Sequence, residues 1–489
     1  MKKSTAVIAL LLIFIVTFAS RLMISFQTEE FSYDSYFALR QIENINEKGV
    51  PLFEDPLSFG GRTHLFPPVF YYLVSVFSFI GVGLTAKIIP NLLSALAVFF
   101  VYLISFNITR KRVISLITAF FSGFIPILFI TVNDISSYSL VTLLVLAVLY
   151  YVMKIESDSY LRPALFLMIL LVLSHASAFL LIIGLLLYLL LLKIESMEVT
   201  SRENEFILFS SFLVLWFNFI IFKKALLFHG PLVIWQNIPI QMLTNYFFDL
   251  NLIQSIYYIG IIPVFFGIYS IYHSLFKIKK KNIFLILSLF LSVLLLLWLK
   301  LVSFNVGLIF ISLMLVILAS HTIKIVYSYL QKTKMPNSAN WFLFALVLVF
   351  FLTTLIPSFN LGLKSLDNTP SEKEIEALEW LKKHSDENDI ILARPEEGHL
   401  INYFAERKTV MDENFLLIED AQERYEDVQS IFSLRLKTEA VRKLNKYNVN
   451  YIYFSGKFGK QKMLYYADRD CFKEVYSDGL KIYNVRCEI

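Results

Sequence analysis

The 489-residue sequence has few charged residues, few glycines and prolines, and almost no cysteine. Charged residues make up 17% of the chain, against about 25% in soluble globular proteins, which excludes an ordinary cytosolic enzyme. Two cysteines are too few for a disulfide scaffold or a zinc module. Instead, 57% of the residues are hydrophobic, including 47 Phe and 26 Tyr. This composition excludes disorder and is typical of a protein whose main solvent is lipid.

Long apolar runs recur along most of the chain. Because a helix needs about 20 apolar residues to cross a bilayer core, we predict about eleven spans. The first run is longer than the apolar core of a signal peptide, so we expect a retained anchor. The predicted spans cover residues 5–24, 86–108, 113–132, 138–153, 163–174, 176–192, 206–222, 254–276, 283–299, 301–320 and 341–356.

Basic residues sort these spans by side of the membrane. Starting from a cytoplasmic N-terminus, eleven spans place every basic cluster inside, as the positive-inside rule requires. The agreement holds only if segment 67–83 does not cross, so we expect an interfacial or half-inserted helix there. The clusters lie at residues 2–3, 110–112, 154 with 162, 193 with 202, 277–281, and 324 with 332 and 334.

The predicted fold is therefore an α-helical polytopic membrane protein of the cell membrane with a C-terminal extracytoplasmic α/β domain. The membrane domain covers residues 1–356 and includes an acidic outer loop at 25–85. In the tail, 357–489, hydropathy falls and charges become dense. There we predict helices at 372–383 and 438–447, strands at 389–393 and 449–454, and a terminal hairpin around Asp478-Gly479, a strong turn signal.

The two cysteines flank this hairpin almost symmetrically. Cys471 precedes its first strand and Cys487 follows its second. Directly opposed residues of paired antiparallel strands have Cβ atoms about 4.5–5.5 Å apart, close to bridging range. Since disulfides persist outside the cell, we predict a Cys471–Cys487 disulfide that closes the hairpin. A one-residue register shift would leave both thiols free.

Two predicted outer loops carry candidate catalytic acids. Asp34 lies in residues 33–40 (YDSYFALR), and Asp134 follows the third span. Carboxylates on two neighbouring outer loops can act as a general base or hold a divalent cation, such as Mg²⁺ or Mn²⁺, against a phosphate. The structural alternative is helix capping, because the short Asp side chain suits a helix N-terminus. Both interpretations stay open at this stage.

Segment 33–40 and the order of the parts resemble the GT-C superfamily of membrane glycosyltransferases, and within it the catalytic subunit of archaeal and bacterial oligosaccharyltransferase. The family's first motif is similar to Asp-Pro-Tyr-Tyr-x-x-Arg, and here Asp34, Tyr36 and Arg40 match it while Ser35 departs. Its second motif is Asp-x-Asp or Asp-Asn-Glu, of which Asn133-Asp134 keeps one carboxylate. The Pro67-Pro68 pair, residues 87–90 and His175 are also similar.

The resemblance implies a GT-C fold and an inverting sugar transfer at the outer face. The donor would be a polyprenyl-phosphate-linked sugar in the membrane lipid, and the acceptor a protein or a glycolipid. Asp34 would be the base or a metal ligand, and Asp134 a second ligand. Tyr36 and Arg40, which match the family motif, would contact the substrate.

Two departures concern the acceptor. The Trp-Trp-Asp-Tyr-Gly motif, with which oligosaccharyltransferases recognise Asn-x-Ser/Thr, is absent from residues 393–414, although Asp412-Glu413-Asn414 resembles the surrounding pattern. The outer-loop glutamate of the family is also absent, because residues 223–253 contain no Glu. We therefore expect sugar transfer without this mode of acceptor recognition.

Several basic residues outside the cytoplasmic loops are candidates for binding the donor phosphate. Lys223, Lys224 and Lys300 stand at outer span ends, where they can neutralise the leaving phosphate or merely reach the lipid headgroups. His175 is a phosphate contact or a polar residue at a helix end. Arg62 and His64 are further loop candidates.

Three other functions fit parts of the sequence. A divergent oligosaccharyltransferase would transfer to protein Asn. A transporter would place ionisable residues near mid-membrane, whereas the predicted spans are nearly free of Asp and Glu. A non-catalytic scaffold would bind a partner through its tail and would not need Asp34. No nucleic-acid partner is predicted.

The predicted topology is testable with single cysteines in a background that lacks Cys471 and Cys487. The Ser58→Cys protein should react with an impermeant thiol reagent in intact cells, because that loop is expected outside. The Ser338→Cys protein should react only after the cells are permeabilised. Labelling of Ser338→Cys in intact cells would contradict the topology.

Overall fold

The computed structural model describes residues 2–487 except 249–250, 278, 335–336, 460 and 462. The chain divides into two compact units. Unit 1 comprises Met1–Glu29, Pro67–Ile221 and Tyr246–Leu366, and unit 2 comprises Glu30–Phe66, Phe222–Asn245 and Asp367–Ile489. The acidic segment 30–66 thus belongs to the same compact unit as the tail. The division at residue 356 into a membrane domain and a tail stays a prediction.

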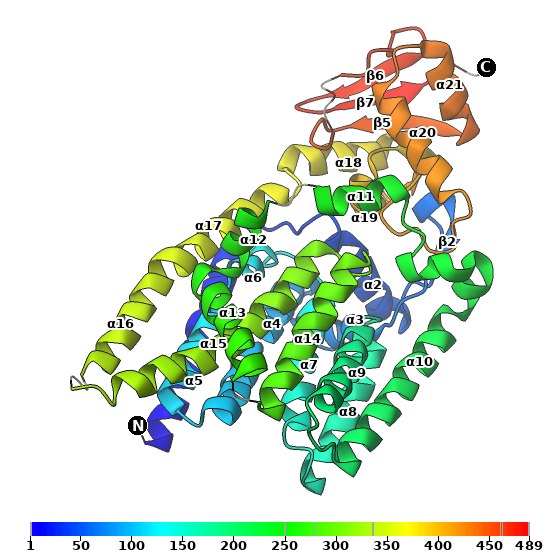
Figure 1. Ribbon diagram of the computed structural model, residues 1–489. Coiled ribbons are helices and arrows are strands. Elements are labelled where there is room, and N and C mark those ends of the chain that lie inside the picture. The colour runs from blue at the N-terminus through cyan, green and yellow to red at the C-terminus, as the bar shows by residue number, and fades with distance from the viewer. Residues whose placement is uncertain are drawn as a thin grey trace. The chain divides into compact units, whose positions relative to one another are not determined.

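Unit 1 is built from long apolar helices (Figure 1). Helices α13 and α15 pack against each other, as do α9 and α14, and α4 and α7. The helices of unit 1 are α1 (Lys3–Ser25), α3 (Val69–Val76), α4 (Val82–Thr109), α5 (Arg112–Gly123), α6 (Pro126–Ile130), α7 (Tyr138–Val152), α8 (Asp158–Ser174), α9 (Ala178–Ile194), α12 (Leu252–Ile259), α13 (Ile261–Phe276), α14 (Lys281–Trp298), α15 (Phe304–Leu330), α16 (Ser338–Phe350) and α17 (Ile356–Ser365), with α10 (Ser201–His229) beginning in it.

The composition and length of these helices identify a multi-pass membrane protein. Within the described ranges, six helices are long and apolar enough to cross a membrane, or seven if the bent pair α12–α13 is one span. Four further apolar helices have 10–17 residues. The polytopic class is confirmed, and the count of eleven spans stays a prediction.

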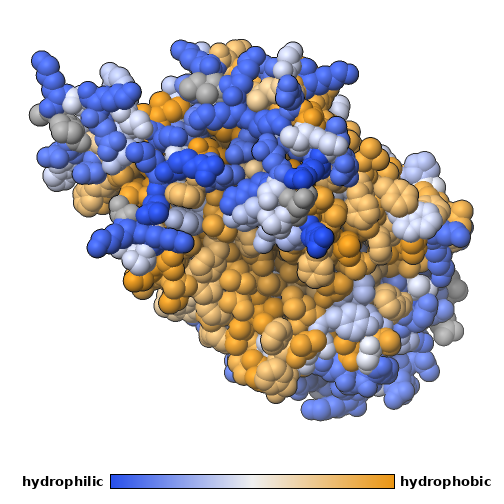
Figure 2. Space-filling view, turned by 90° about the horizontal axis from the view of Figure 1, so that it is seen from below, coloured by the Kyte–Doolittle hydropathy of each residue, from blue (hydrophilic) through white to orange (hydrophobic). Residues whose placement is uncertain are grey.

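Apolar side chains face outward on several of these helices. Leu208 of α10 is 73% exposed and Trp341 of α16 is 70% exposed. Figure 2 shows such side chains gathered in one broad continuous area. Soluble monomers rarely expose a contiguous apolar patch above a few hundred Å², so this surface is one that lipid covers. Helix α15 differs from these helices, since its most apolar stretch is wholly buried inside the structure.

Three predicted spans are not single straight helices. The run 113–132 divides into α5 and α6, because Pro126 begins a new helix and cannot continue the old one. The run 254–276 bends by 97° between α12 and α13 at Gly260, whose φ of +98° is readily adopted only by glycine. Helix α16 passes through a π-helical turn, Phe351–Leu355, into α17.

The α-helix within segment 67–83 is too short to cross the membrane. Its helix α3 has eight residues, followed by a 3₁₀ turn at Ser78–Ile80. Eight residues of α-helix span about 12 Å, well short of a bilayer core of about 30 Å. The predicted topology requires that segment 67–83 does not cross the membrane, and its short helix is consistent with this requirement.

Unit 2 contains a five-stranded mixed sheet in the order β4-β3-β5-β7-β6. Strand β3 pairs in parallel with β4 and β5, and β7 pairs antiparallel with β5 and β6. The strands are β3 (Ile390–Leu392), β4 (Lys408–Thr409), β5 (Val449–Phe454), β6 (Phe472–Ser477) and β7 (Lys481–Val485), and β1 (Glu54–Asp55) pairs with β2 (Arg62–Thr63) separately. The helices are α2 (Ser35–Lys48), α11 (Ile240–Phe248), α18 (Glu372–His384), α19 (Gly398–Phe404), α20 (Ala421–Ser433) and α21 (Lys437–Lys446).

The predicted elements of the tail are present with bounds close to those expected. Helix α18 begins with a capping box, in which the side chains of Ser371 and Glu374 reciprocally bond each other's backbone N–H. Strand β5 has the predicted bounds, and β6 and β7 turn at Asp478-Gly479. The α/β class of the tail is therefore confirmed.

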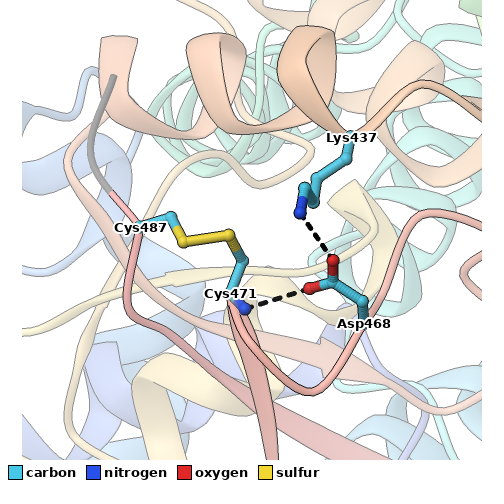
Figure 3. The surroundings of a disulfide bond; sticks show 4 residues. All are labelled: Lys437, Asp468, Cys471 and Cys487. Atoms are coloured by element: carbon cyan, nitrogen blue, oxygen red, sulfur yellow. Dashed lines mark hydrogen bonds and ion pairs between the residues drawn. A yellow bond between two sulfur atoms is a disulfide. The ribbon is translucent and has the colours of Figure 1, made fainter.

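A disulfide joins Cys471 and Cys487, whose Cα atoms lie 4.9 Å apart (Figure 3). Asp468 accepts a 3.0 Å hydrogen bond from the backbone N–H of Cys471 and a 2.6 Å bond from Lys437 Nζ. The turn that leads into β6 is thus attached both to the segment after β7 and to α21.

Removing the disulfide should loosen the hairpin selectively. Closing a loop of about 15 residues is worth about 3 kcal/mol in the chain-entropy model. In the Cys471→Ser/Cys487→Ser protein, amide hydrogen exchange of β6 and β7 should report a local opening free energy lower by up to about that amount. Exchange in β3 should change less. Unchanged exchange in β6 and β7 would show that the hairpin does not depend on the bond.

Candidate functional site

Asp34 immediately precedes α2, and its side chain does not cap that helix. It is exposed, its backbone is already helical (φ −64°, ψ −25°), and its carboxylate accepts no hydrogen bond from the first turn of α2, all of which is described. An N-cap residue normally has an extended backbone and accepts such a bond. The capping interpretation is therefore not supported for Asp34, and its carboxylate is available for another role.

The partner of Asp34 is Glu413, from the segment that follows β4 in the tail. The two carboxyl groups share a hydrogen bond, so one of them carries the proton. Desolvation of Glu413 raises its pKa well above the ordinary value, and the charge and hydrogen bond of Asp34 raise it further. Glu396 and Asp412 add negative charge nearby. Two carboxylates in contact resist double ionisation, which is a feature of several acid–base sites.

The segment that carries Glu413 is attached to the first outer loop. Arg62 donates from Nη1 to the backbone oxygen of Asn414 and from Nη2 to that of Leu416, the latter at 2.5 Å. Ser58 donates a short hydrogen bond to the buried Asp412. Arg62 is buried, and it therefore has a positioning role: it holds residues 412–416 beside the loop that bears Asp34.

Arg40 and His64 are held by a second buried carboxylate, Asp55. Arg40 donates two hydrogen bonds to Asp55, at 2.7 and 2.8 Å, and His64 Nε2 lies 3.4 Å from it. Burial alone would raise the pKa of Asp55, but the hydrogen bonds from His64 and Arg40 outweigh it and hold that pKa below its ordinary value. The structure thus gives both candidates the same carboxylate partner within the protein, by an ion pair for Arg40 and a hydrogen bond for His64.

Tyr36 lies in the first turn of α2, and its side chain is buried. Its hydroxyl donates to Glu30 at 2.5 Å, and its ring packs against Tyr403 and Phe404 of α19. Tyr33, one residue before Asp34, donates to Glu374 at 2.6 Å. These contacts hold the start of α2 against the tail, which orients Asp34.

A cavity of about 540 Å³ lies at the C-terminal half of α2. Its lining includes Arg40 of the predicted set but not Asp34, and it carries acidic and basic side chains in comparable number. The lining residues are Arg40, Glu43, Asn44, Glu47, Lys48, Leu52, Pro56, Leu57, Glu387, Asn388, Asn402, Tyr403, Glu406, Arg407 and Lys408.

In unit 1, the loop that carries Asp134 is attached to a buried arginine. Arg21 of α1 donates to Asn91 Oδ1 at 2.9 Å and to the backbone oxygen of Leu128 at 2.5 Å, and the charge of Asp134 acts on its guanidinium. Asn133 accepts a 2.8 Å hydrogen bond from Ser25. Arg21 is not among the site residues predicted from the sequence, because its partners Asn91 and Leu128 lie far along the chain.

The remaining basic candidates are distributed over both units. In unit 1, His175 lies between α8 and α9, where its Nδ1 contacts Ser177 at 2.9 Å, and Lys300 follows α14. In unit 2, Lys223 and Lys224 belong to the last part of α10, and Lys224 Nζ lies 3.3 Å from Thr63 Oγ1 in β2. Lys224 therefore contacts β2, the strand that also contains Arg62.

Glu413 and Glu396 are not among the site residues predicted from the sequence. The one available signal was Asp412-Glu413-Asn414, whose similarity to a family pattern carried no assigned role. Within the described part of the chain, no group of three or more His, Cys, Asp or Glu residues is arranged to hold a metal ion. The Asp34–Glu413 pair supplies two carboxylates, a number with which Mg²⁺ is often bound when substrate phosphates and waters complete its shell.

The fold can be compared with known proteins. No protein-family model and no curated protein matches the chain. Among solved structures, it is similar to the apo oligosaccharyltransferase of Archaeoglobus fulgidus (TM-score 0.72, 14% identity, 92% of this chain and 70% of that chain). A structure of the archaeal oligosaccharyltransferase AglB from Archaeoglobus fulgidus with an inhibitory peptide and a dolichol-phosphate has a TM-score of 0.70 (14% identity, 92% and 69%).

A second similarity covers nearly the whole of both chains. ArnT from Cupriavidus metallidurans, bound to undecaprenyl phosphate, has a TM-score of 0.57 at 9% identity over 99% of this chain and 98% of that one. These neighbours are GT-C glycosyltransferases, so the fold of this chain is a GT-C fold and the expected resemblance is confirmed. At such identities the similarity establishes the fold alone.

Glu397 provides a test of the buried acidic groups in unit 2. It is 1% exposed, and burial raises its pKa to about 8. Because the folded state then binds the proton more tightly than the unfolded state, this residue stabilises the fold below about pH 4.5, and that contribution is lost as pH rises toward 8. In Glu397→Gln, the fall in the unfolding temperature between pH 5 and pH 8 should be smaller than in the wild type.

The matched control is Glu419→Gln, which removes an exposed carboxylate from the same unit. It should keep the wild-type pH dependence. An equal pH dependence in Glu397→Gln and the wild type would show that Glu397 ionises in the fold as readily as in water.

Proposed function

We propose that this protein is a membrane glycosyltransferase that moves a sugar from a polyprenyl-phosphate carrier to an acceptor. The observation that carries the proposal is the Asp34–Glu413 carboxyl pair in a GT-C fold, with Asp34 exposed and not engaged as a helix cap. The neighbours support the class of donor, since one is described with dolichol-phosphate and another with undecaprenyl phosphate.

In the proposed reaction, Asp34 is the general base. The carboxylate takes the proton of the acceptor's nucleophilic group as that group attacks the anomeric carbon. A bond forms between acceptor and sugar, the bond between the anomeric carbon and the phosphate oxygen breaks, and the polyprenyl phosphate leaves with the electron pair. Attack from the face opposite the leaving group inverts the anomeric centre.

Glu413 is proposed as the residue that positions this base. Desolvation, and then the charge and hydrogen bond of Asp34, raise the pKa of Glu413 well above its ordinary value, so Glu413 keeps the shared proton and donates it to Asp34. Glu413 is itself held in place by Arg62 through Asn414 and Leu416.

A divalent cation, Mg²⁺ or Mn²⁺, is proposed to bind at Asp34 and Glu413 when the donor is present. In this alternative, in which Asp34 is a metal ligand and not the base, the cation would take the place of the shared proton and would neutralise charge on the leaving phosphate. One neighbouring oligosaccharyltransferase structure is described as a complex with Zn and sulfate. Asp134 is retained as a second candidate ligand or base, from its place in the sequence.

Basic residues are proposed to bind the donor phosphate. Lys223, Lys224 and Lys300 have flexible ammonium groups suited to an anion at the membrane surface, and His175 is a further candidate. In this proposal the N-terminus is cytoplasmic, and residues 357–489 and the acidic loop lie outside the cell, where the acceptor protein or glycolipid is found.

A second candidate function is transfer to protein Asn. The TM-scores favour it, because the archaeal oligosaccharyltransferase scores 0.72 and ArnT 0.57. The missing tryptophans in 393–414 and the missing Glu in 223–253 oppose the family's mode of acceptor recognition. Incubation of membranes with an Asn-x-Thr peptide and lipid-linked sugar separates the two, since only the second function glycosylates the peptide.

Asp34→Asn should abolish transfer without unfolding the protein. Asn keeps the size of the side chain but cannot accept a proton, and losing a general base lowers a rate by about 10²–10⁴-fold. Cells without the gene should accumulate a polyprenyl-phosphate-linked sugar, measured by mass spectrometry of lipid extracts. The wild-type chain should remove the accumulation and Asp34→Asn should not, with Asp134→Asn having a weaker effect.

Glu47→Gln is the matched control, because Glu47 is an exposed carboxylate on the same helix, α2. It should remove the accumulation at equal membrane abundance. Full complementation by Asp34→Asn would refute the proposed base, and an unchanged lipid profile in cells without the gene would favour the scaffold.

A further inference from the structure

Two histidines, one in the last turn of α13 and one in the C-terminal half of α15, meet inside unit 1. His273 and His321 have ring centroids 5.6 Å apart, and His321 is 2% exposed. Neither ring nitrogen of His321, nor Nδ1 of His273, has a hydrogen-bond partner among the described residues. A buried imidazole without partners loses its bonds to water and gains none, so such a pair is costly unless a ligand satisfies it.

The two helices bring these rings together by packing closely (Figure 1). A Cβ at Gly267 of α13 would lie 2.9 Å from the backbone oxygen of Leu315 in α15, so only glycine permits this approach. Thr322, the neighbour of His321, donates a 2.7 Å hydrogen bond to the backbone oxygen of Phe266. The position of His321 is therefore set by rigid contacts on the residue beside it.

Two lysines act on His321, and two further cations act on one of those lysines. The charges of Lys280 and Lys324 act on His321, and those of Lys280, Lys111 and Arg110 act on Lys324. These residues come from three parts of the chain: the turn between α4 and α5, the loop between α13 and α14, and the end of α15. Their mutual repulsion is unfavourable unless a negative charge lies among them.

Acidic partners are present nearby but bind other lysines. Lys279 forms an ion pair with Glu195, and Lys281 forms one with Glu203 at 3.0 Å. Across the described ranges, no ion pair joins an acidic residue to Lys280, Lys324, Arg110 or Lys111. The cluster of His273, His321, Lys280, Lys324, Arg110 and Lys111, which we call the basic cluster, therefore keeps its net positive charge.

We propose that the basic cluster binds the phosphate group of an anionic membrane lipid. A phosphate has several acceptor oxygens, so one group can accept from the imidazole N–H groups and from the lysine ammonium groups together. Basic pockets between transmembrane helices are recurrent sites for such headgroups. This site lies apart from Asp34 in the chain and needs no part of the proposed sugar transfer.

A lipid is favoured over free phosphate by the apolar side chains at the same helix ends. Phe276, the last residue of α13, is 73% exposed, and Tyr329 of α15 is 71% exposed. Aromatic side chains exposed at the ends of membrane helices lie at the level of headgroups and acyl chains. A headgroup bound between Lys280 and Lys324 would place its acyl chains on a surface of this kind.

The test uses the full-length protein with phosphatidylglycerol and phosphatidylcholine as probes. In native mass spectrometry from detergent, the wild type should retain phosphatidylglycerol in preference to phosphatidylcholine. Lys280→Gln and Lys324→Gln should each weaken retention of phosphatidylglycerol about 5-fold, from the loss of one cation near an anionic headgroup. Both lysines are only half-buried, so these proteins should fold.

Lys332→Gln is the matched control, since Lys332 is an exposed lysine shortly after α15 and outside the cluster. It should retain phosphatidylglycerol as the wild type does. His321→Phe, which keeps a buried ring but removes both nitrogens, should also weaken retention. Equal retention of the two lipids by the wild type, or equal losses in Lys324→Gln and Lys332→Gln, would overturn the site.

Inorganic phosphate distinguishes the two sources of the ligand. If millimolar phosphate displaces phosphatidylglycerol from the wild type but not from Lys324→Gln, the cluster is a phosphate site that free phosphate can also occupy. If phosphate has no effect while the lipid preference depends on Lys280 and Lys324, the lipid is the ligand. Phosphatidylglycerol binding that is unaffected by Lys280→Gln, Lys324→Gln and His321→Phe would refute the proposal.

Discussion

A charged side chain that leaves water must find compensating partners, and this constraint explains where the buried polar residues of this protein lie. Arg21 is among the largest fully buried side chains, and it is satisfied by Asn91, the backbone oxygen of Leu128 and the charge of Asp134. In unit 2, Asp55 is satisfied by Arg40 and His64. Each of these clusters attaches a loop to a helix or to a distant part of the chain, so the same contacts that offset desolvation also give the loops their shape.

The Asp34–Glu413 pair is different, because like charges are brought together rather than neutralised. The surrounding framework makes this possible: Tyr33 and Tyr36 hold the start of α2 against the tail, and Arg62 and Ser58 hold residues 412–416. A shared proton relieves part of the repulsion, which leaves a group able to exchange that proton with a substrate. Pairs of this kind are a common feature of sites that transfer protons, whereas the buried Asp55 and Asp412 are paired with cations.

The basic cluster of unit 1 shows the same constraint with the opposite sign. Lysines on either side of Lys280 are paired with glutamates, while the cations around His321 lie near one another. Positive charge at this end follows the distribution that orients membrane proteins, but orientation requires neither buried imidazoles nor a close approach of α13 and α15 at Gly267. The combination of burial, missing partners and convergent charge is what distinguishes a binding site from charges that only set topology.

The class of the protein and much of its local structure could be predicted from the sequence alone. Hydropathy over stretches of about 20 residues predicted a polytopic membrane protein, the helix predicted at 372–383 is present as α18, and Asp478-Gly479 predicted the hairpin. These signals succeed because they depend on neighbouring residues. The motif at Asp34 indicated the GT-C fold for the same reason. Tertiary structure decided the rest: that 113–132 breaks at Pro126, that Tyr36 is buried, that Arg40 and His64 share Asp55, and that Glu413 lies against Asp34. Contacts such as Ser58–Asp412, 354 residues apart, leave no periodic trace in the sequence, since only the packing of the loop against the tail brings such partners together.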